Sequence, residues 1–172
     1  MGKAKLQAEL GVSKDKAEEL FAIYHQRVPF VKTLMKSVSN RAQQRGQIRT
    51  LLGRLCRFHL WEPNRFGINK ALPFEQAVQE HGQGNIRRAY TYKALNKLIQ
   101  GSAADMTKKS MLDLYKEGII AHIQIHDELD LSVESPEQAK KVVEIMENAV
   151  KLDVPNKVDY ESGKNWGDIY DK

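Results

Sequence analysis

The segment most informative about the fold of this chain is Ile119-Ile-Ala-His-Ile-Gln-Ile-His-Asp-Glu-Leu-Asp-Leu-Ser-Val-Glu134. Two runs rich in β-branched and other apolar residues flank the polar triplet His126-Asp127-Glu128, and this pattern predicts two strands joined by a tight turn. Successive side chains of a strand point to opposite faces. We therefore expect Leu129, Leu131 and Val133 to face packed helices and the residues between them to face away.

The predicted turn carries two candidate metal ligands, Asp127 and Glu128. Hard cations such as Mg²⁺ prefer oxygen ligands, and a hairpin tip can hold carboxylates rigidly without burying their charge. Acidic residues also suit the geometry of a tight turn, so a purely structural role stays open. No second carboxylate lies upstream in a comparable strand, so we expect this chain to supply only part of a two-metal site.

Composition limits the class of protein. The 172 residues suffice for one domain or for a piece of a larger protein. No apolar run approaches the roughly 20 residues of a membrane-spanning helix, and the start of the chain lacks a signal-peptide layout. The single Cys56 suits a reducing compartment. We expect a cytoplasmic protein without membrane contact, in a bacterial or phage-infected cell.

Charge is distributed unevenly along the chain. The formal net charge is +5, yet residues 1–99 hold eighteen Lys or Arg against seven Asp or Glu, and residues 100–172 hold nine against fifteen. A basic half followed by an acidic half indicates contact with a polyanion in the first and metal chemistry in the second. The alternative is that the cations merely solvate helix faces.

Hydrophobic periodicity predicts a mainly helical chain around the hairpin, which makes the expected fold class α+β, with helices packed on a small antiparallel sheet. Residues 59–85 are rich in Gly and Pro and are interpreted as a surface insertion. In the first half of the chain we expect a helix over 3–10, a second helix that starts at the Ser13 cap, a third helix over 29–45, two short strands within 46–58 and a short helix at 74–80. In the second half we expect a helical stretch over 86–117 with a bend or break at Gly101-Ser102, a helix from Ser135-Pro136 to about Val150, and a last strand over 157–161.

Two amides define a candidate nucleic-acid face. Asn96 and Gln100 are one helical turn apart and so share a face. Every Watson–Crick pair shows hydrogen-bond acceptors in the minor groove, which amide donors can contact without reading sequence. Four cations flank this face and are candidate phosphate contacts, namely Arg87, Arg88, Lys93 and Lys97. For all of these residues, an ordinary solvated surface is the alternative.

Several ordered motifs resemble one enzyme family. Asn96-Lys-Leu-Ile-Gln-Gly-Ser-Ala-Ala-Asp105 looks like the N-x-x-x-Q-G-[ST]-A-A-D junction of family A DNA polymerases, the bacterial DNA polymerase I type. Ile123-Gln-Ile-His-Asp-Glu-Leu129 looks like the family's V-H-D-E-L palm motif, and Gly163-Lys-Asn-Trp-Gly-Asp168 looks like its closing G-x-N-W segment. Thr50-Leu-Leu-Gly-Arg54 resembles the T-L-x-G-R hairpin, and Met1–Leu10 resembles the helix that follows the fingers. The resemblance covers nearly the whole chain, and we expect a phage source.

The resemblance implies specific roles. Asp127 would be one of two palm aspartates that bind the catalytic Mg²⁺ ions, with Glu128 supporting the site. His126 would join the two amides in touching primer–template DNA near the growing end, and Arg54 would lie near the DNA backbone. The chain would comprise a helical segment next to the fingers (1–45), a hairpin with an irregular insertion (46–85) and a palm portion with the metal-binding hairpin (86–172).

The chain also departs from the family pattern. It has no D-Y-S-x-I-E type strand, which carries the other palm aspartate, and no fingers helix with the Lys, Arg and Tyr that grip the triphosphate of the dNTP. Tyr92 stands where many relatives have Arg, and the insertion is longer than in most. We therefore expect the C-terminal part of a split or truncated DNA polymerase, inactive without an N-terminal polypeptide that carries the missing groups.

Two other functions compete with this interpretation. A non-catalytic module could retain only the surface that binds primer–template DNA. A small metal-dependent nuclease could use His126, Asp127 and Glu128, although the chain lacks the further carboxylate or His cluster that a self-sufficient site needs.

Overall fold

The computed structural model describes residues 3–65, 67 and 69–170. Expectations that touch Met1, Gly2 and residues 66, 68 and 171–172 lie outside the described residues. The helices are α1 (Lys3–Leu10), α2 (Lys14–Arg27), α3 (Pro29–Arg45), α4 (Phe74–His81), α5 (Ala94–Lys116), α6 (Pro136–Asn148) and α7 (Gly167–Tyr170), with 3-10 turns η1 (Gln83–Asn85) and η2 (Thr91–Lys93). The strands are β1 (Gln47–Arg49), β2 (Leu55–Arg57), β3 (Trp61–Pro63), β4 (Ile86–Arg88), β5 (Ile123–Ile125) and β6 (Glu128–Asp130).

The mixture of helices and short antiparallel strands confirms the α+β class. In the part of the chain that the structure describes, the strands form three separate two-stranded sheets, β1–β2, β3–β4 and β5–β6. The chain divides into two compact units, and each is considered by itself. The first comprises Met1–Arg49 and Gly53–Leu98, and the second comprises Thr50–Leu52 and Ile99–Lys172. None of the helices described has the length and apolar content of a membrane span.

Local sequence signals set the helices of the first unit. The Ser13 side chain accepts a hydrogen bond from Lys16 N at 3.2 Å and caps α2, as predicted. Pro29 occupies the first turn of α3, where its missing N–H leaves no hydrogen bond unmade. The helix ends at Gly46, whose φ of 68° is left-handed, and Gly46 N donates to Ala42 O.

The core of the first unit joins α3 to the β1–β2 hairpin. The two strands pair in the register Ile48↔Cys56, which confirms the hairpin expected within residues 46–58. Ile48 packs with other buried residues from α3, from the end of β2 and from the start of α5. These are Val38, Ala42, Phe58 and Ala94.

The insertion is more ordered than the sequence indicates. Its short helix is present as α4, but β3 precedes it and pairs antiparallel with β4, in the register Glu62↔Arg87. Trp61 also exchanges backbone hydrogen bonds of 2.7 and 2.8 Å with Leu72, whose side chain is buried. The expectation that the segment from residue 86 onward is helical is therefore wrong at its start, because Ile86–Arg88 is a strand.

The expected break at Gly101-Ser102 is wrong, because helix α5 runs through both residues. The other form of that expectation, a bend without a break, stays a prediction. Within the second unit, the Ser102 hydroxyl accepts a hydrogen bond from Leu51 N at 3.0 Å. A tertiary contact thus offsets the low helix propensity of Gly and Ser.

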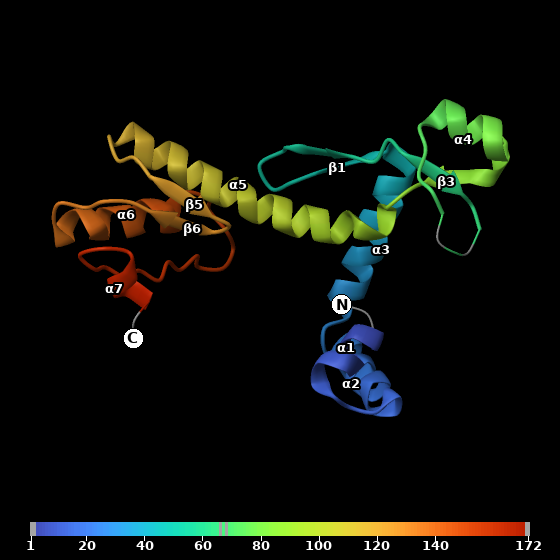
Figure 1. Cartoon of the computed structure of the whole chain (residues 1–172), viewed down its shortest axis with the longest axis horizontal. Helices are drawn as coiled ribbons and strands as arrows, with labels where there is room; N and C mark the ends of the chain where they lie inside the picture. Colours follow the sequence, from blue (N-terminus) through green and yellow to red (C-terminus); the bar gives the residue numbers. More distant parts are fainter. Residues whose placement is uncertain (1–2, 66, 68, 171–172) are drawn as a thin grey trace. The chain divides into compact units, whose positions relative to one another are not determined.

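The second unit packs the β5–β6 hairpin with α6 and the later turns of α5, as the yellow and orange segments of Figure 1 show. Its buried centre is Leu114, Ile119 and Val142, with Leu129 and Leu131 against it, as predicted. Val133 is exposed instead, because β6 has already ended.

The last expected strand, over residues 157–161, is absent from this described segment. Val158 N donates at 3.2 Å to the Glu147 carboxylate on α6, so a side chain rather than a neighbouring strand takes its hydrogen bond.

Candidate metal and nucleic-acid site

The β5–β6 register places His126 and Asp127 at the hairpin tip. Ile125 pairs with Glu128, which leaves these two residues as the loop. His126 has a φ of 53°, a left-handed conformation in which His is enriched among non-glycine residues. Gln124 Nε2 donates to His126 O at 2.9 Å and so holds the turn. The predicted hairpin tip is confirmed, and its backbone strain makes it a candidate functional position.

Acidic side chains gather on this hairpin. Asp127 and Glu128 are both exposed. Asp130 lies two residues beyond Glu128 and so shares its face of the strand. Burial and the negative charge of Glu128 raise the pKa of the Asp130 carboxyl above its usual range. Burial contributes most to this rise in pKa, and the neighbouring Glu128 carboxylate adds to it.

The carboxylates at this hairpin are donors of the kind that magnesium takes from proteins. Carboxylate oxygens are the ligands that Mg²⁺ takes from proteins, commonly one or two, with water and substrate phosphates completing the shell. Among the described residues, no group of three or more His, Cys, Asp or Glu side chains lies close enough to hold a metal ion. A metal site supplied in part by Asp127 and Glu128 therefore stays a prediction.

The outward face of this hairpin is also apolar. Ile123 is 42% exposed and Ile125 is 39% exposed, and they pair with Asp130 and Glu128 respectively. Within the described residues, β5 pairs only with β6, so its other edge has no strand beside it. An apolar surface next to an open strand edge is a surface that proteins usually cover.

The predicted DNA-contacting residues of α5 and η2 are exposed. Asn96 and Gln100 lie one turn apart on α5. Lys93, on η2, places its ammonium group 5.1 Å from the centre of the Tyr90 ring and 5.7 Å from that of Tyr92. Exposed aromatic rings interleaved with cations are typical of surfaces that bind nucleic acid strands.

The other candidate cations have different surroundings. Arg54 is exposed after the β1–β2 turn, and the Lys97 ammonium lies 5.0 Å from the Phe58 ring centre. Arg87 Nε donates to Glu62 at 2.9 Å. Arg88 is half-buried, and its guanidinium is engaged with protein carbonyl groups. A role of Arg88 toward DNA stays a prediction.

The sequence-based site divides between the two units. Arg54, Arg88, Lys93 and Asn96 belong to the first, whereas Gln100 and the three hairpin residues belong to the second. Sequence reasoning overlooked Tyr90 and Tyr92, which are 39% and 69% exposed. The alternation in Tyr90-Thr-Tyr-Lys93 could have indicated them, because aromatic residues next to a cation are a common feature of surfaces that bind nucleic acid strands.

Comparison with known proteins gives consistent matches. The family model described as DNA polymerase family A matches residues 1–168. The chain is similar to a DNA-directed DNA polymerase of Pseudomonas phage M6, with 36% identity over 150 residues that make up 87% of this chain and 19% of that protein. It is also similar to DNA polymerase I of Bacillus caldotenax, with 36% identity over 172 residues, covering 95% of this chain and 18% of that protein.

A solved structure also resembles the chain. It is the POL domain of Pol1 from M. smegmatis in complex with DNA primer-template and dNTP, with a TM-score of 0.64 and 28% identity. The match covers 90% of this chain and 26% of that one. The chain thus spans about a fifth of the length of the curated relatives it matches and about a quarter of this solved domain.

Proposed function

This chain belongs to DNA polymerase family A, and from that premise we propose that it works as the C-terminal part of a DNA-directed DNA polymerase. In this role it contributes to template-dependent nucleotidyl transfer during DNA replication, in the cytoplasm of a bacterial or phage-infected cell. The observation that carries the proposal is the exposed Asp127 at the two-residue tip of the β5–β6 hairpin, with Glu128 beside it.

Asp127 is the metal ligand in this proposal, and Glu128 supports it. Mg²⁺, when bound, would lower the pKa of the primer 3′-hydroxyl and neutralise charge on the triphosphate of the dNTP. Asp127 contributes a fixed anionic oxygen, and the hairpin limits the freedom of that oxygen. Phosphoryl transfer depends mainly on such positioning and charge neutralisation.

The remaining catalytic groups come from protein beyond these 172 residues, whether joined to the chain or separate from it. We assign to that protein the second palm aspartate and the fingers helix. The exposed Ile123 and Ile125 and the open edge of β5 support this assignment, because they offer an apolar surface and unpaired backbone groups to another strand. By itself the chain is inactive.

Primer–template DNA is the proposed partner of the polar side chains outside the hairpin. Asn96 and Gln100 present amides to the minor groove, and Lys93 and Arg54 lie near phosphates. His126 contributes a ring nitrogen to a sugar or base edge at the primer end. Binding of this kind falls steeply with salt, because each phosphate contact releases counterions.

A chimaeric enzyme tests the catalytic proposal. This chain would replace the matching fifth of Bacillus caldotenax DNA polymerase I, and primer extension would be measured with and without Mg²⁺. We expect Mg²⁺-dependent synthesis from the chimaera and none from the 172 residues by themselves. Asp127→Ala should abolish synthesis and leave DNA binding largely intact, whereas Asp153→Ala, which removes an exposed acid outside the hairpin, should have little effect. A folded chimaera that synthesises DNA equally well with Asp127→Ala would refute the assignment.

The lack of a complete acidic cluster among the described residues favours one alternative, a non-catalytic module that binds primer–template DNA. The two functions separate in the chimaera, because a mere binding module would restore DNA affinity without restoring synthesis. A self-contained nuclease predicts cleavage of labelled DNA by the chain with Mg²⁺, and we expect none.

A further inference from the structure

The turn η2 carries an exposed lysine whose charge lies against two aromatic rings instead of an acid. The Lys93 ammonium is 5.1 Å from the centre of the Tyr90 ring and 5.7 Å from that of the Tyr92 ring. Both distances are within the roughly 6 Å over which the face of a ring attracts a cation. In the part of the chain that the structure describes, no carboxylate pairs with this ammonium. The charge is therefore held in place without being neutralised.

The backbone of η2 explains why the lysine and the rings meet. Lys93 N donates to Tyr90 O at 2.9 Å and closes one 3-10 turn, a geometry in which side chains three residues apart eclipse each other. Tyr90 has a φ of 61°, which is unfavourable for a bulky side chain. The residue before it is fixed, because Ala89 is buried and its N–H donates to Leu60 O at 2.9 Å. Surrounding structure thus holds the turn in its strained conformation.

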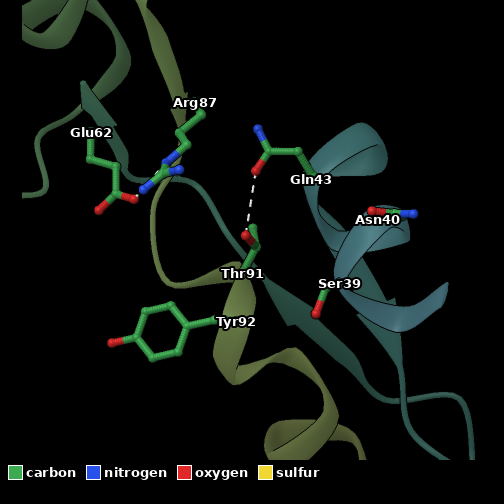
Figure 2. A pocket seen from close by; sticks show the side chains of 7 residues that line it. All are labelled: Ser39, Asn40, Gln43, Glu62, Arg87, Thr91 and Tyr92. Atoms are coloured by element: carbon green, nitrogen blue, oxygen red, sulfur yellow. Dashed lines mark hydrogen bonds and ion pairs between the residues drawn. The ribbon is translucent and has the colours of Figure 1, made fainter. Parts of the chain in front are cut away.

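The residue between the two tyrosines faces α3. The Thr91 hydroxyl donates to Gln43 Oε1 at 3.4 Å, the contact drawn as a dashed line in Figure 2. Turned by 180°, the Gln43 amide would instead pair with both backbone groups of Arg88, at 2.9 and 3.2 Å, just before the turn. Figure 2 shows the Tyr92 ring on the side of Thr91 that faces away from α3. The turn is therefore anchored on one side and presents Tyr92, which is 69% exposed, on the other.

A lysine in this setting differs from an ordinary surface lysine. The ammonium of a free lysine sits on a flexible four-carbon stem, and binding a partner costs much of that freedom. Two rings restrict the ammonium before any partner arrives, so less freedom is lost on binding. A carboxylate would restrict it too, but it would compete with an incoming anion. The arrangement thus suits contact with an anion that is itself held in a fixed place, such as a phosphate of a DNA duplex.

We propose that Tyr90 and Tyr92 are positioning residues for DNA binding, whose rings hold the Lys93 ammonium where it contacts one phosphate of the duplex. The inference rests on the proposed function, in which Lys93 lies near a phosphate, and it adds the two side chains that orient this lysine. In this role the rings act through Lys93 and do not stack on a base.

A double-mutant cycle tests whether the rings act through the lysine. Binding of the 172-residue chain to a blunt DNA duplex is measured by fluorescence anisotropy over a series of salt concentrations. Lys93→Met should reduce the salt slope by about 0.9, because one phosphate contact is lost. Tyr92→Leu should weaken binding by about 2- to 12-fold, the cost of immobilising one flexible side chain, and leave the slope unchanged. In the Lys93→Met background, Tyr92→Leu should have no further effect.

Two controls separate this role from a general effect on the surface. Lys97 follows Lys93 by four residues, and its ammonium lies over a different ring, 5.0 Å from the centre of Phe58. In a Lys97→Met background, Tyr92→Leu should therefore keep its full effect. Tyr92→Phe keeps the ring and should bind like the parent chain. Circular dichroism and urea unfolding verify that each variant is folded, and Tyr90→Leu repeats the cycle at the second ring.

The outcomes separate this inference from the proposed function. If Tyr92→Leu weakens binding equally with and without Lys93, the ring contacts DNA directly, and the inference falls while the proposed function stands. The inference also falls if both leucine variants bind like the parent chain, or if Lys93→Met leaves the salt slope unchanged. If the parent chain binds no duplex, the proposed function itself falls and this inference with it.

Discussion

Arg88 is the residue at which a DNA-binding prediction and the structure lead to different expectations. Its Nε donates to Gln43 O at 3.2 Å, its Nη1 donates to Phe58 O at 2.9 Å, and its guanidinium lies 4.5 Å from the centre of the Trp61 ring. A Cβ added at Gly46 would lie 2.6 Å from the same guanidinium. Arg88 thus joins the end of α3, the end of β2 and the start of β3.

The contacts allow the cost of Arg88→Met to be worked out. Hydrogen bonds from a charged donor contribute about 1.5–3 kcal/mol each, and a partly exposed site favours the lower end. The contact with Trp61 adds about 0.5–1 kcal/mol, while methionine keeps most of the aliphatic packing. We expect the free energy of unfolding of the first unit to fall by about 3.5–4 kcal/mol.

Urea unfolding followed by tryptophan fluorescence measures this change. In a Trp166→Phe background, Trp61 is the only tryptophan and reports on the first unit. Lys93→Met is the matched control, because Lys93 is exposed and is the predicted phosphate contact. It should leave stability nearly unchanged but reduce the salt slope of DNA binding by about 0.9 per lost phosphate contact. Arg88→Met with parental stability and a reduced salt slope would refute the structural role.

Three further outcomes are expected. Leu114 is fully buried, so Leu114→Ala should lower the unfolding free energy of the second unit by about 2–5 kcal/mol, while Leu112→Ala, at a half-exposed position, should cost under about 0.5 kcal/mol in urea unfolding followed by circular dichroism. Hydrogen bonds from Lys109 and Lys116 hold the pKa of Asp113 below its ordinary value of 3.8. The stability that this carboxylate adds is therefore present above about pH 4 and is lost as the pH falls through the lowered pKa. The difference in thermal midpoint between the parent and Asp113→Asn should shrink in acid, and a constant difference would contradict the ion pairs. His126→Gly should relieve the left-handed strain by about 0.5–1 kcal/mol and slow amide exchange in β5 and β6, and faster exchange would show that the His126 side chain supports the turn.

Local signals in the sequence were enough to predict several elements. The bounds of α3 follow from Pro29 and Gly46, and the caps of α2 and α6 follow from Ser13 and Ser135. The hairpin tip at His126-Asp127 follows from two β-rich runs around a polar pair. In each of these cases the residues that determine the backbone are adjacent in the chain, so the pattern and the structure agree.

Elements that depend on distant contacts were missed. Strand β4 has three residues, and its partner β3 lies 25 positions away at the pair Glu62↔Arg87, so no local periodicity could reveal it. Helix α5 continues through Ser102, whose hydroxyl accepts a hydrogen bond from Leu51 N, 51 positions away in the sequence. The strand expected over 157–161 is absent. A local sequence pattern does not specify which strand would pair with it, and Val158 N–H donates its hydrogen bond to the Glu147 carboxylate instead.

The candidate metal site combines both situations. Its ligand type and turn were readable from the sequence, because Asp127 and Glu128 are neighbours on a short hairpin. The remaining ligands of such a site cannot be predicted from neighbouring residues. The same outer face carries the exposed Ile123 and Ile125, together with Asp130, whose carboxyl pKa is raised. The inner face of this hairpin already packs on Leu114, Ile119 and Val142, so the outer face is the one that a covering layer would still stabilise. In the proposed role, protein that covers this outer face would also bring the missing metal ligand, so we expect metal affinity and hairpin stability to rise together when the rest of the polymerase is supplied.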